Sequence, residues 1–235
     1  MAVTLNVQNA ITYAETVLKN QRMNVNNQEP GRTAANNVLQ TMLSPPFIWR
    51  QNRSNLSFPV TETNGTDYVL SVLDMGWIET QWIVDAQGNK FELKGAQSLP
   101  QVQTKRQPTV LAPVYDDNQG SITFRVNSIP DEPYTVFVDY QRAAPVIKSF
   151  GTTFAPMPDA CGYLFNRGVL AECALLVNDS RWEQWKGEWL AGLLATQDGL
   201  DAQAKAIFYD QMLNAGRTSL RSQGLTQSGT AGRQR

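Results

Sequence analysis

Histidine is absent from the 235-residue chain, and this absence bears on most of the chemistry that a protein can carry out. Histidine is the most common general base, the most common zinc ligand and the usual partner of a catalytic serine or cysteine. The two cysteines, Cys161 and Cys173, are too few for a zinc site or a disulfide framework. On one helix they would lie about 18 Å apart, too far for a disulfide. We expect two buried thiols, no catalytic residue, no metal, no cofactor, and a protein that is not an enzyme.

Acidic residues on neighbouring predicted strands are the main alternative source of chemistry. A glycosidase needs two carboxylates facing each other across a cleft, and Glu79, Asp85 and Glu92 could supply a pair. Acids at alternate positions of half-exposed strands are more often the solvated face of a sheet. Residues 116–120 (DDNQG) contain oxygen ligands suited to calcium, but they lack the carboxylate pattern of an EF-hand. We therefore expect a turn at that segment.

Five of the six tryptophans fall into two groups. Trp182, Trp185 and Trp189 recur at helical spacing, which predicts packing in a helical core or in an interface between subunits. Trp77 and Trp82 are five residues apart on a predicted strand, so we expect them on opposite faces. The ring that faces outward could bind a sugar or a partner protein.

Helical periodicity occurs towards both ends of the chain, where apolar residues recur at i, i+3 or i+4, and i+7. The segments with this spacing are residues 10–18, 35–42, 163–177, 182–193 and 204–212. The last helix is expected to stop at Gly216, because glycine is common just after the end of a helix.

Between the helical segments, polar and apolar residues alternate with a period of two. The alternation is strongest in Ser121–Val126 and Tyr134–Tyr140, and it places Ile78, Thr80 and Trp82 together on one strand face. Turn-forming residues separate six or seven short strands. This pattern predicts antiparallel sheets in a sandwich or a small barrel.

The order of the segments predicts an α+β protein. We expect an α-helical bundle built from both chain ends, with an inserted antiparallel β domain and an extended C-terminal tail. The expected boundaries are 1–55 for the N-terminal helices, 56–148 for the β domain, 149–215 for the C-terminal helices and 216–235 for the tail. No apolar run approaches the about 20 residues needed to span a bilayer, so no membrane partner is expected.

Charge is unevenly distributed along the chain. The totals of 20 basic and 21 acidic residues give a net charge of −1, but the segment from Gly216 onward carries four arginines and no acid. Its Ser, Thr, Gln and Gly residues cannot build a core. Arginines without acids suit an acidic protein surface or nucleic-acid phosphates, whereas a solvated, frayed terminus is the plain alternative.

Several short strings occur in a particular order between residues 8 and 220. They are FIWR at 47–50, GTDYVL at 65–70, IE at 78–79, NDSR at 178–181 and IF at 207–208. Together with the order of helices, insert and helices, these strings resemble the head-to-tail adaptor proteins of tailed bacteriophages. That family includes tail tubular protein A and the head-completion adaptors.

The resemblance implies a structural virion protein at the head–tail interface, made in the host cytoplasm. Members of this family form a homo-oligomeric ring, usually a dodecamer, below the portal protein. Genomic DNA passes through the ring during ejection without sequence-specific binding. The tail nozzle or stopper protein binds on the other side of the ring.

Carried over to this chain, the resemblance assigns roles to particular residues. The portal-docking arm would comprise Arg217, Leu220, Arg221, Leu225, Arg233 and Arg235. Trp77 and Trp82 are candidates for the face that binds the next tail component, and Trp182, Trp185 and Trp189 for ring or core packing. The β domain is larger than in the helical adaptors, so it could bind a nozzle, a fibre or a decoration protein.

Two other functions stay open at the level of sequence. Another structural virion protein, such as a nozzle or minor head protein, would have the same composition. A carbohydrate-binding module or glycosidase on the β domain would need Trp77 or Trp82 beside two carboxylates in a cleft.

Overall fold

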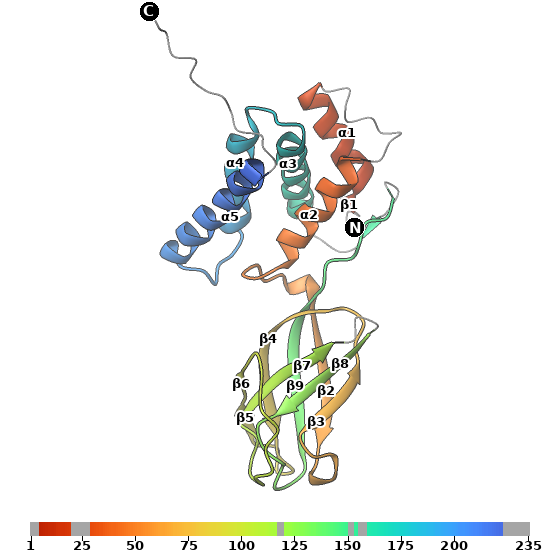
Figure 1. Cartoon of the computed structure of the whole chain (residues 1–235), viewed down its shortest axis with the longest axis vertical. Helices are drawn as coiled ribbons and strands as arrows, with labels where there is room; N and C mark the ends of the chain where they lie inside the picture. The colour runs from red at the N-terminus through yellow and green to blue at the C-terminus, as the bar shows by residue number, and fades with distance from the viewer. Residues whose placement is uncertain (1–4, 20–28, 117–119, 150–152, 155–158, 223–235) are drawn as a thin grey trace, which may run out of the picture. The chain divides into compact units, whose positions relative to one another are not determined.

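The chain is an α+β protein, as predicted, in which helices and strands occur in two compact units (Figure 1). The computed structural model describes residues 5–19, 29–116, 120–149, 153–154 and 159–222. One unit comprises residues 1–42 and 145–235, and the other comprises residues 43–144. Among the described residues, none of the helices combines the length and the apolarity that crossing a membrane requires.

The first unit is helical. Its helices are α1 (Val7–Leu18), α2 (Gly31–Leu43), α3 (Asp159–Leu176), α4 (Trp182–Ala195) and α5 (Ala202–Ser222), and a two-stranded sheet joins β1 (Leu5–Asn6) to β10 (Thr153–Phe154). Helix α3 packs against both α1 and α4, and α5 packs against α4. The Oδ1 atom of Asp201 accepts the backbone N–H of Ala204 at 2.7 Å and so caps the first turn of α5.

Gly168 lets three helices approach one another closely. A Cβ atom at this position of α3 would lie 2.7 Å from Val38 of α2 and 2.7 Å from the indole of Trp189 of α4. Real Cβ atoms do not come this close to other heavy atoms, so a larger residue would push the helices apart. The three helices therefore meet around the Trp189 ring.

Helix α5 continues to Ser222, so the prediction that it stops at Gly216 is wrong. A Cβ atom at Gly216 would lie 3.2 Å from Cζ3 of Trp182, a tight contact. The glycine makes room for this ring on α4 and does not end the helix. The predicted extended tail therefore begins too early, because residues 216–222 are helical.

The second unit contains two four-stranded sheets, with strand orders β2-β9-β4-β5 and β3-β8-β7-β6. The strands are β2 (Arg53–Val60), β3 (Asp67–Ser71), β4 (Met75–Val84), β5 (Lys90–Glu92), β6 (Lys94–Gly95), β7 (Val110–Asp116), β8 (Ser121–Val126) and β9 (Tyr134–Arg142). Both sheets contribute to one hydrophobic core, in which Phe58 packs against Phe124 with ring centroids 5.7 Å apart. Two sheets that share a core in this way are typical of a β-sandwich.

Three details of the β unit differ from the sequence expectations. The sheets are not closed into a barrel, so the small-barrel alternative is wrong. The sheets are not purely antiparallel, because β6 pairs with β7 in parallel through Lys94 and Val110. The described residues contain eight strands here, because the segment around Leu93 divides into two short strands, β5 and β6, which belong to different sheets.

Candidate interaction sites

The tryptophans of α4 lie at different depths. Trp182 and Trp189 are 4% and 2% exposed, so they belong to the core of the helical unit. Trp185 is half-buried, and the guanidinium carbon of Arg181 lies 4.6 Å from its ring centroid. A ring that is buried within its own subunit cannot also form an interface, so Trp185 is the member of the group that can contact a partner.

Trp77 and Trp82 lie on the same face of β4, so the expectation of opposite faces is wrong. Trp77 is paired with Gln141 of β9 and Trp82 with Phe137, and these two residues are four positions apart on a regular strand. Residues directly opposite each other in an antiparallel pair share a face. The register shifts twice along β4, once between Ile78 and Thr80, which turns Ile78 towards the core.

Both sides of the Trp82 ring are covered. Phe137 stacks against it with centroids 5.6 Å apart and an interplanar angle of 8°, and Nζ of Lys90 lies 3.9 Å from its centroid. The strand order β9-β4-β5 places these two partners on opposite sides of the ring. A sugar could stack on Trp82 only by displacing one of them, which weighs against carbohydrate binding at this ring.

Two of the three candidate glycosidase carboxylates have structural partners. Glu79 accepts hydrogen bonds from Arg53 and from Nε2 of Gln141, and its side chain is only 5% exposed. Asp85 accepts the backbone N–H groups of Gln87 at 2.9 Å and Asn89 at 2.8 Å, which fixes the turn after β4. Glu92 is exposed. The contacts of Glu79 and Asp85 therefore do not support a role for either carboxylate in a glycosidase pair.

Metal and thiol chemistry have no support among the described residues. No group of three or more His, Cys, Asp or Glu side chains is arranged to hold a metal ion within them, and residues 117–119 of the proposed calcium loop lie outside them. Cys161 and Cys173 are both buried, as expected. Burial, together with the nearby carboxylate of Glu172, raises the pKa of Cys173 to about 12, so its thiolate is not formed at neutral pH.

The proposed docking arm is only partly described. Arg217 lies on α5, where it forms an ion pair with Glu183 of α4 and a hydrogen bond of 3.0 Å with Oδ1 of Asn214. Leu220 and Arg221 belong to the last turns of α5, but their side chains lie outside the described part of the chain. Leu225, Arg233 and Arg235 lie outside the described residues altogether. Arg217 is thus bound to its own unit.

Asp67, in the GTDYVL string, holds the β unit together at one point. Nε and Nη2 of Arg125 on β8 donate to its two carboxylate oxygens at 2.6 and 2.7 Å, and Nη1 donates to the carbonyl of Leu99 at 2.9 Å. Gln101 donates to the same carboxylate at 3.2 Å. The cluster therefore ties the long loop after β6 to strands β3 and β8, and this string has a structural role.

We expect Asp67→Asn to destabilise the β unit in a pH-dependent way. The hydrogen bonds from Arg125 hold the pKa of Asp67 below its usual range. A carboxylate whose pKa is lower in the folded state stabilises the fold at neutral pH, and this contribution is lost as the pH falls through the folded pKa. The substitution should lower the free energy of unfolding by about 1–2 kcal/mol at pH 7.

The measurement is urea unfolding at a series of pH values. The difference between the original chain and Asp67→Asn should shrink as the pH falls from about 5 to about 2. Glu62→Gln is the control, because the Glu62–Lys105 pair is exposed and should contribute less than about 1 kcal/mol. A difference that stays constant over the whole pH range would contradict the assigned role of the Asp67 charge.

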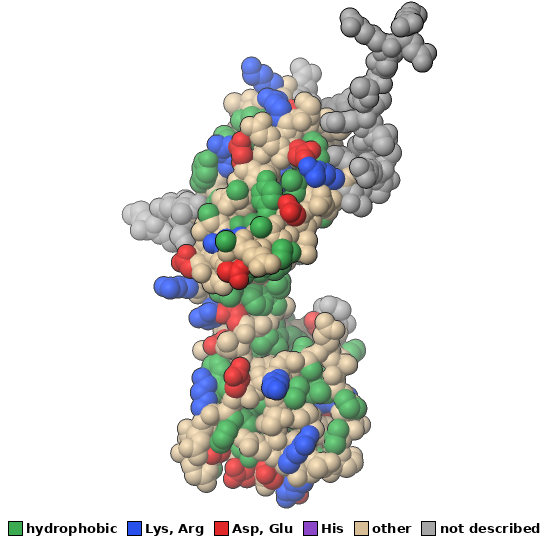
Figure 2. Space-filling view, turned by 90° about the vertical axis from the view of Figure 1, so that its left-hand side faces the viewer, with side chains coloured by type: hydrophobic (Ala, Val, Ile, Leu, Met, Phe, Trp, Pro, Cys, Tyr) green, Lys and Arg blue, Asp and Glu red, His purple; other side chains and the backbone are tan. Residues whose placement is uncertain are grey.

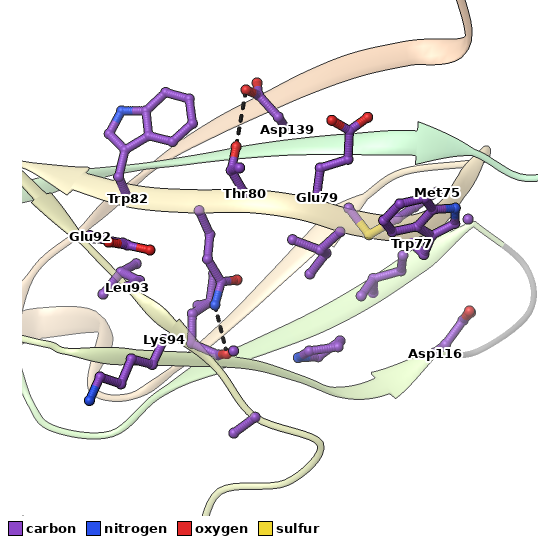
Figure 3. Close-up of a pocket in the computed structure, with 18 of the residues that line it drawn as sticks. Met75, Trp77, Glu79, Thr80, Trp82, Glu92, Leu93, Lys94, Asp116 and Asp139 are labelled. Carbon is purple, nitrogen blue, oxygen red and sulfur yellow. Dashed lines mark hydrogen bonds between the residues drawn. The ribbon is translucent and has the colours of Figure 1, made fainter. Parts of the chain in front are cut away.

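A groove of about 1030 Å³ lies along one edge of the β unit, beside β4 (Figure 3). Figure 3 shows Glu79, Thr80 and Trp82 on one side of β4, with Thr80 hydrogen-bonded to Asp139 at 3.3 Å. Gln81 also lines the groove although it is only 5% exposed. Gln81 is not among the site residues predicted from the sequence. The available signal was a polar residue between Thr80 and Ile83 in a half-buried strand.

The face of the molecule drawn in Figure 2 carries charges of both signs. Figure 2 shows basic and acidic side chains interspersed over the visible face of the molecule, without one continuous basic patch among the coloured residues. Stable binding to phosphates depends on clustered cations. No such cluster is visible among the coloured residues of this face.

Comparisons with known proteins add no further assignment. No protein-family model matches the chain, and no curated protein sequence matches it significantly.

Proposed function

We propose that the chain is a structural virion protein without enzymatic activity, a head-to-tail adaptor that joins the portal to the tail of a bacteriophage. The observation that supports this most is the division of the chain into two units, in which both chain ends contribute to one unit and residues 43–144 form the other. In the proposal, the terminal helices form one bundle into which the β unit is inserted. The same order of segments carries the resemblance to the adaptor family.

In this proposal the subunits form a ring of twelve copies that DNA crosses without binding. Residues 55–215 carry 11 basic and 19 acidic residues, so the body of each subunit is acidic. An acidic surface repels phosphates, which keeps the passing DNA from adhering to the ring. A closed ring needs one heterologous interface repeated around its axis, and Trp185 is a candidate for it.

The portal-docking arm of the proposal comprises residues 223–235. The segment contains Leu225, Arg233 and Arg235 and no acidic residue, so it suits an acidic surface on the portal. Arg217 is not part of this arm, because it pairs with Glu183 on the neighbouring helix. The β unit would face the nozzle or stopper, and the half-buried Trp77 is a candidate residue for that contact.

Truncation after Ser222 tests the proposal. The shortened chain should lose binding to the portal protein of the same phage, measured by sedimentation of the mixture, while its far-ultraviolet circular dichroism and thermal unfolding stay unchanged. The matched control is Arg217→Ala in the full chain, which should retain portal binding. If the truncated chain binds the portal as tightly as the full chain does, the arm has no docking role.

The ring is tested separately by native mass spectrometry of the full chain, alone and with the portal protein. The adaptor role predicts a closed ring of about twelve chains when the portal is present. A chain that remains monomeric in the presence of the portal would overturn the adaptor role.

A further inference from the structure

One edge of β4 lacks a neighbouring strand over much of its length. β4 pairs with β9 along one side, from Met75 to Val84, but on the other side β5 pairs only with residues 82–84. Within the described chain, residues 75–80 have no strand beside them on that side. An unpaired strand edge presents backbone N–H and C=O groups that can pair with another chain.

The groove beside this edge contains two buried polar atoms that lack hydrogen-bond partners. Nε2 of Gln81 donates to the carbonyl of Leu111 at 3.3 Å, but Oε1 of the same side chain has no partner, and neither has Nε1 of Trp77. A buried polar atom left without a partner destabilises the structure. The groove therefore lacks one donor, to satisfy Gln81, and one acceptor, to satisfy Trp77.

The other residues that line the groove are apolar or charged. The apolar ones include Ile78, Leu111 and Ile122, which also belong to the core of the β unit or pack against it. Of the charged ones, Glu79 pairs with Arg53 and Lys90 lies over the Trp82 ring, and the others are Glu92, Asp116, Asp139 and Lys94. An occupant with apolar side chains and a positive charge complements this lining.

We propose that the groove binds an extended segment of a partner polypeptide, with apolar side chains at alternate positions and at least one basic residue. The successive backbone N–H and C=O groups of an extended segment include the kind of donor that Gln81 lacks and the kind of acceptor that Trp77 lacks, and they can pair with the free edge of β4. A sugar fits less well, because both sides of the Trp82 ring are covered. The inference depends on the groove alone and not on the adaptor role.

The two register shifts in β4 restrict what can bind. They lie between Met75 and Trp77 and between Ile78 and Thr80, within the free edge itself. Bulges interrupt a regular hydrogen-bond ladder, which is one way in which proteins prevent indiscriminate pairing at sheet edges. The segment should therefore be short, and the side-chain atoms of Gln81 and Trp77 should contribute to its recognition.

The test uses nuclear magnetic resonance of the ¹⁵N-labelled full chain. The probe is a capped hexapeptide in which valine alternates with threonine and one threonine is replaced by lysine. Saturable shifts are expected for the indole N–H of Trp77 and for the side-chain amide of Gln81, while the indole N–H of Trp82 stays unchanged. A matched peptide with alternate backbone nitrogens methylated should bind at least about fivefold more weakly, because each methyl group removes a donor.

A variant that fills the groove provides the second measurement. Ala96 lines the groove and is half-buried, so Ala96→Trp should abolish the shifts of Gln81 while the rest of the spectrum shows a folded β unit. Equal binding of the methylated peptide, binding to Ala96→Trp, or an absence of saturable shifts would each overturn the proposal. So would stronger binding of maltotriose, or of a peptide of residues 223–235, since these assign the groove to a sugar or to a second copy of the chain.

Discussion

Trp189→Ala should lower the free energy of unfolding of the helical unit by about 3–5 kcal/mol, the range for removing a large aromatic side chain from a core. The ring is 2% exposed and lies where α2, α3 and α4 meet. Because Gly168 has no Cβ atom, α3 closely approaches both the Trp189 ring and Val38 of α2. Helices that are this close cannot collapse into the space that the ring leaves, so the cavity should persist.

The measurement is urea unfolding followed at 222 nm, which reports on the helices and hence on this unit. Trp185→Ala is the matched control, because the same residue type on the same helix is only half-buried there. It should cost less than half as much as Trp189→Ala. Equal losses from the two substitutions would show that the burial of Trp189 does not determine the stability of the unit.

Lys186→Ala should be comparably severe, with an expected loss of about 3–5 kcal/mol, because it leaves a buried carboxylate without its partner. Nζ of Lys186 on α4 lies 2.7 Å from Oε1 of Glu172 on α3, and the two side chains are only 12% and 9% exposed. Removing the ammonium group alone leaves the Glu172 carboxylate without its ion-pair partner in a largely buried site. Lys186→Met combined with Glu172→Gln should recover most of the loss, because no buried charge remains.

A second ion pair between the same two helices serves as the control. Arg167 and Glu188 lie 3.4 Å apart, and their side chains are 32% and 48% exposed. Glu188→Ala should cost less than about 1 kcal/mol, as exposed pairs do. If Lys186→Ala proved as mild as Glu188→Ala, the buried pair would contribute nothing to the association of α3 with α4.

The regular strands could be predicted from the sequence because their alternation has a direct physical cause. In β8, Ile122, Phe124 and Val126 are buried, and the residues between them are less so, as the period of two predicts. The same holds for β9 from Tyr134 to Tyr140. One face of each strand lies against the core, so burial and sequence follow the same period.

The expectations fail where one local pattern fits two structures. A bulge adds one residue between Ile78 and Thr80. Strict alternation along the sequence does not account for this extra residue, so it predicts the wrong face for Trp77. Gly216 was interpreted as a helix end, but it allows a close approach to Trp182. Both features depend on a neighbour that is distant in sequence, which local periodicity does not contain.

The candidate groove could not be predicted from the sequence, because it also depends on residues that are distant in sequence. Gln81 and Leu111 are thirty residues apart, yet their hydrogen bond defines one wall of the groove. The two tryptophans of β4 were identified in advance, but the covering of Trp82 by Phe137 and Lys90 depends on strand order. The residue types alone suggest a site on β4. The pairing of the strands is needed to show which side-chain atoms of β4 could contact a ligand.

The burial of Cys161 and Cys173 has a practical consequence for work on assembly. Since both thiols are buried in the folded chain, a cysteine introduced at an exposed position should react faster with a maleimide reagent than they do. A fluorophore or spin label could then be attached at a chosen point without first removing the native cysteines. In the proposed ring, distances between labels on neighbouring copies would report on how many chains associate and in what orientation.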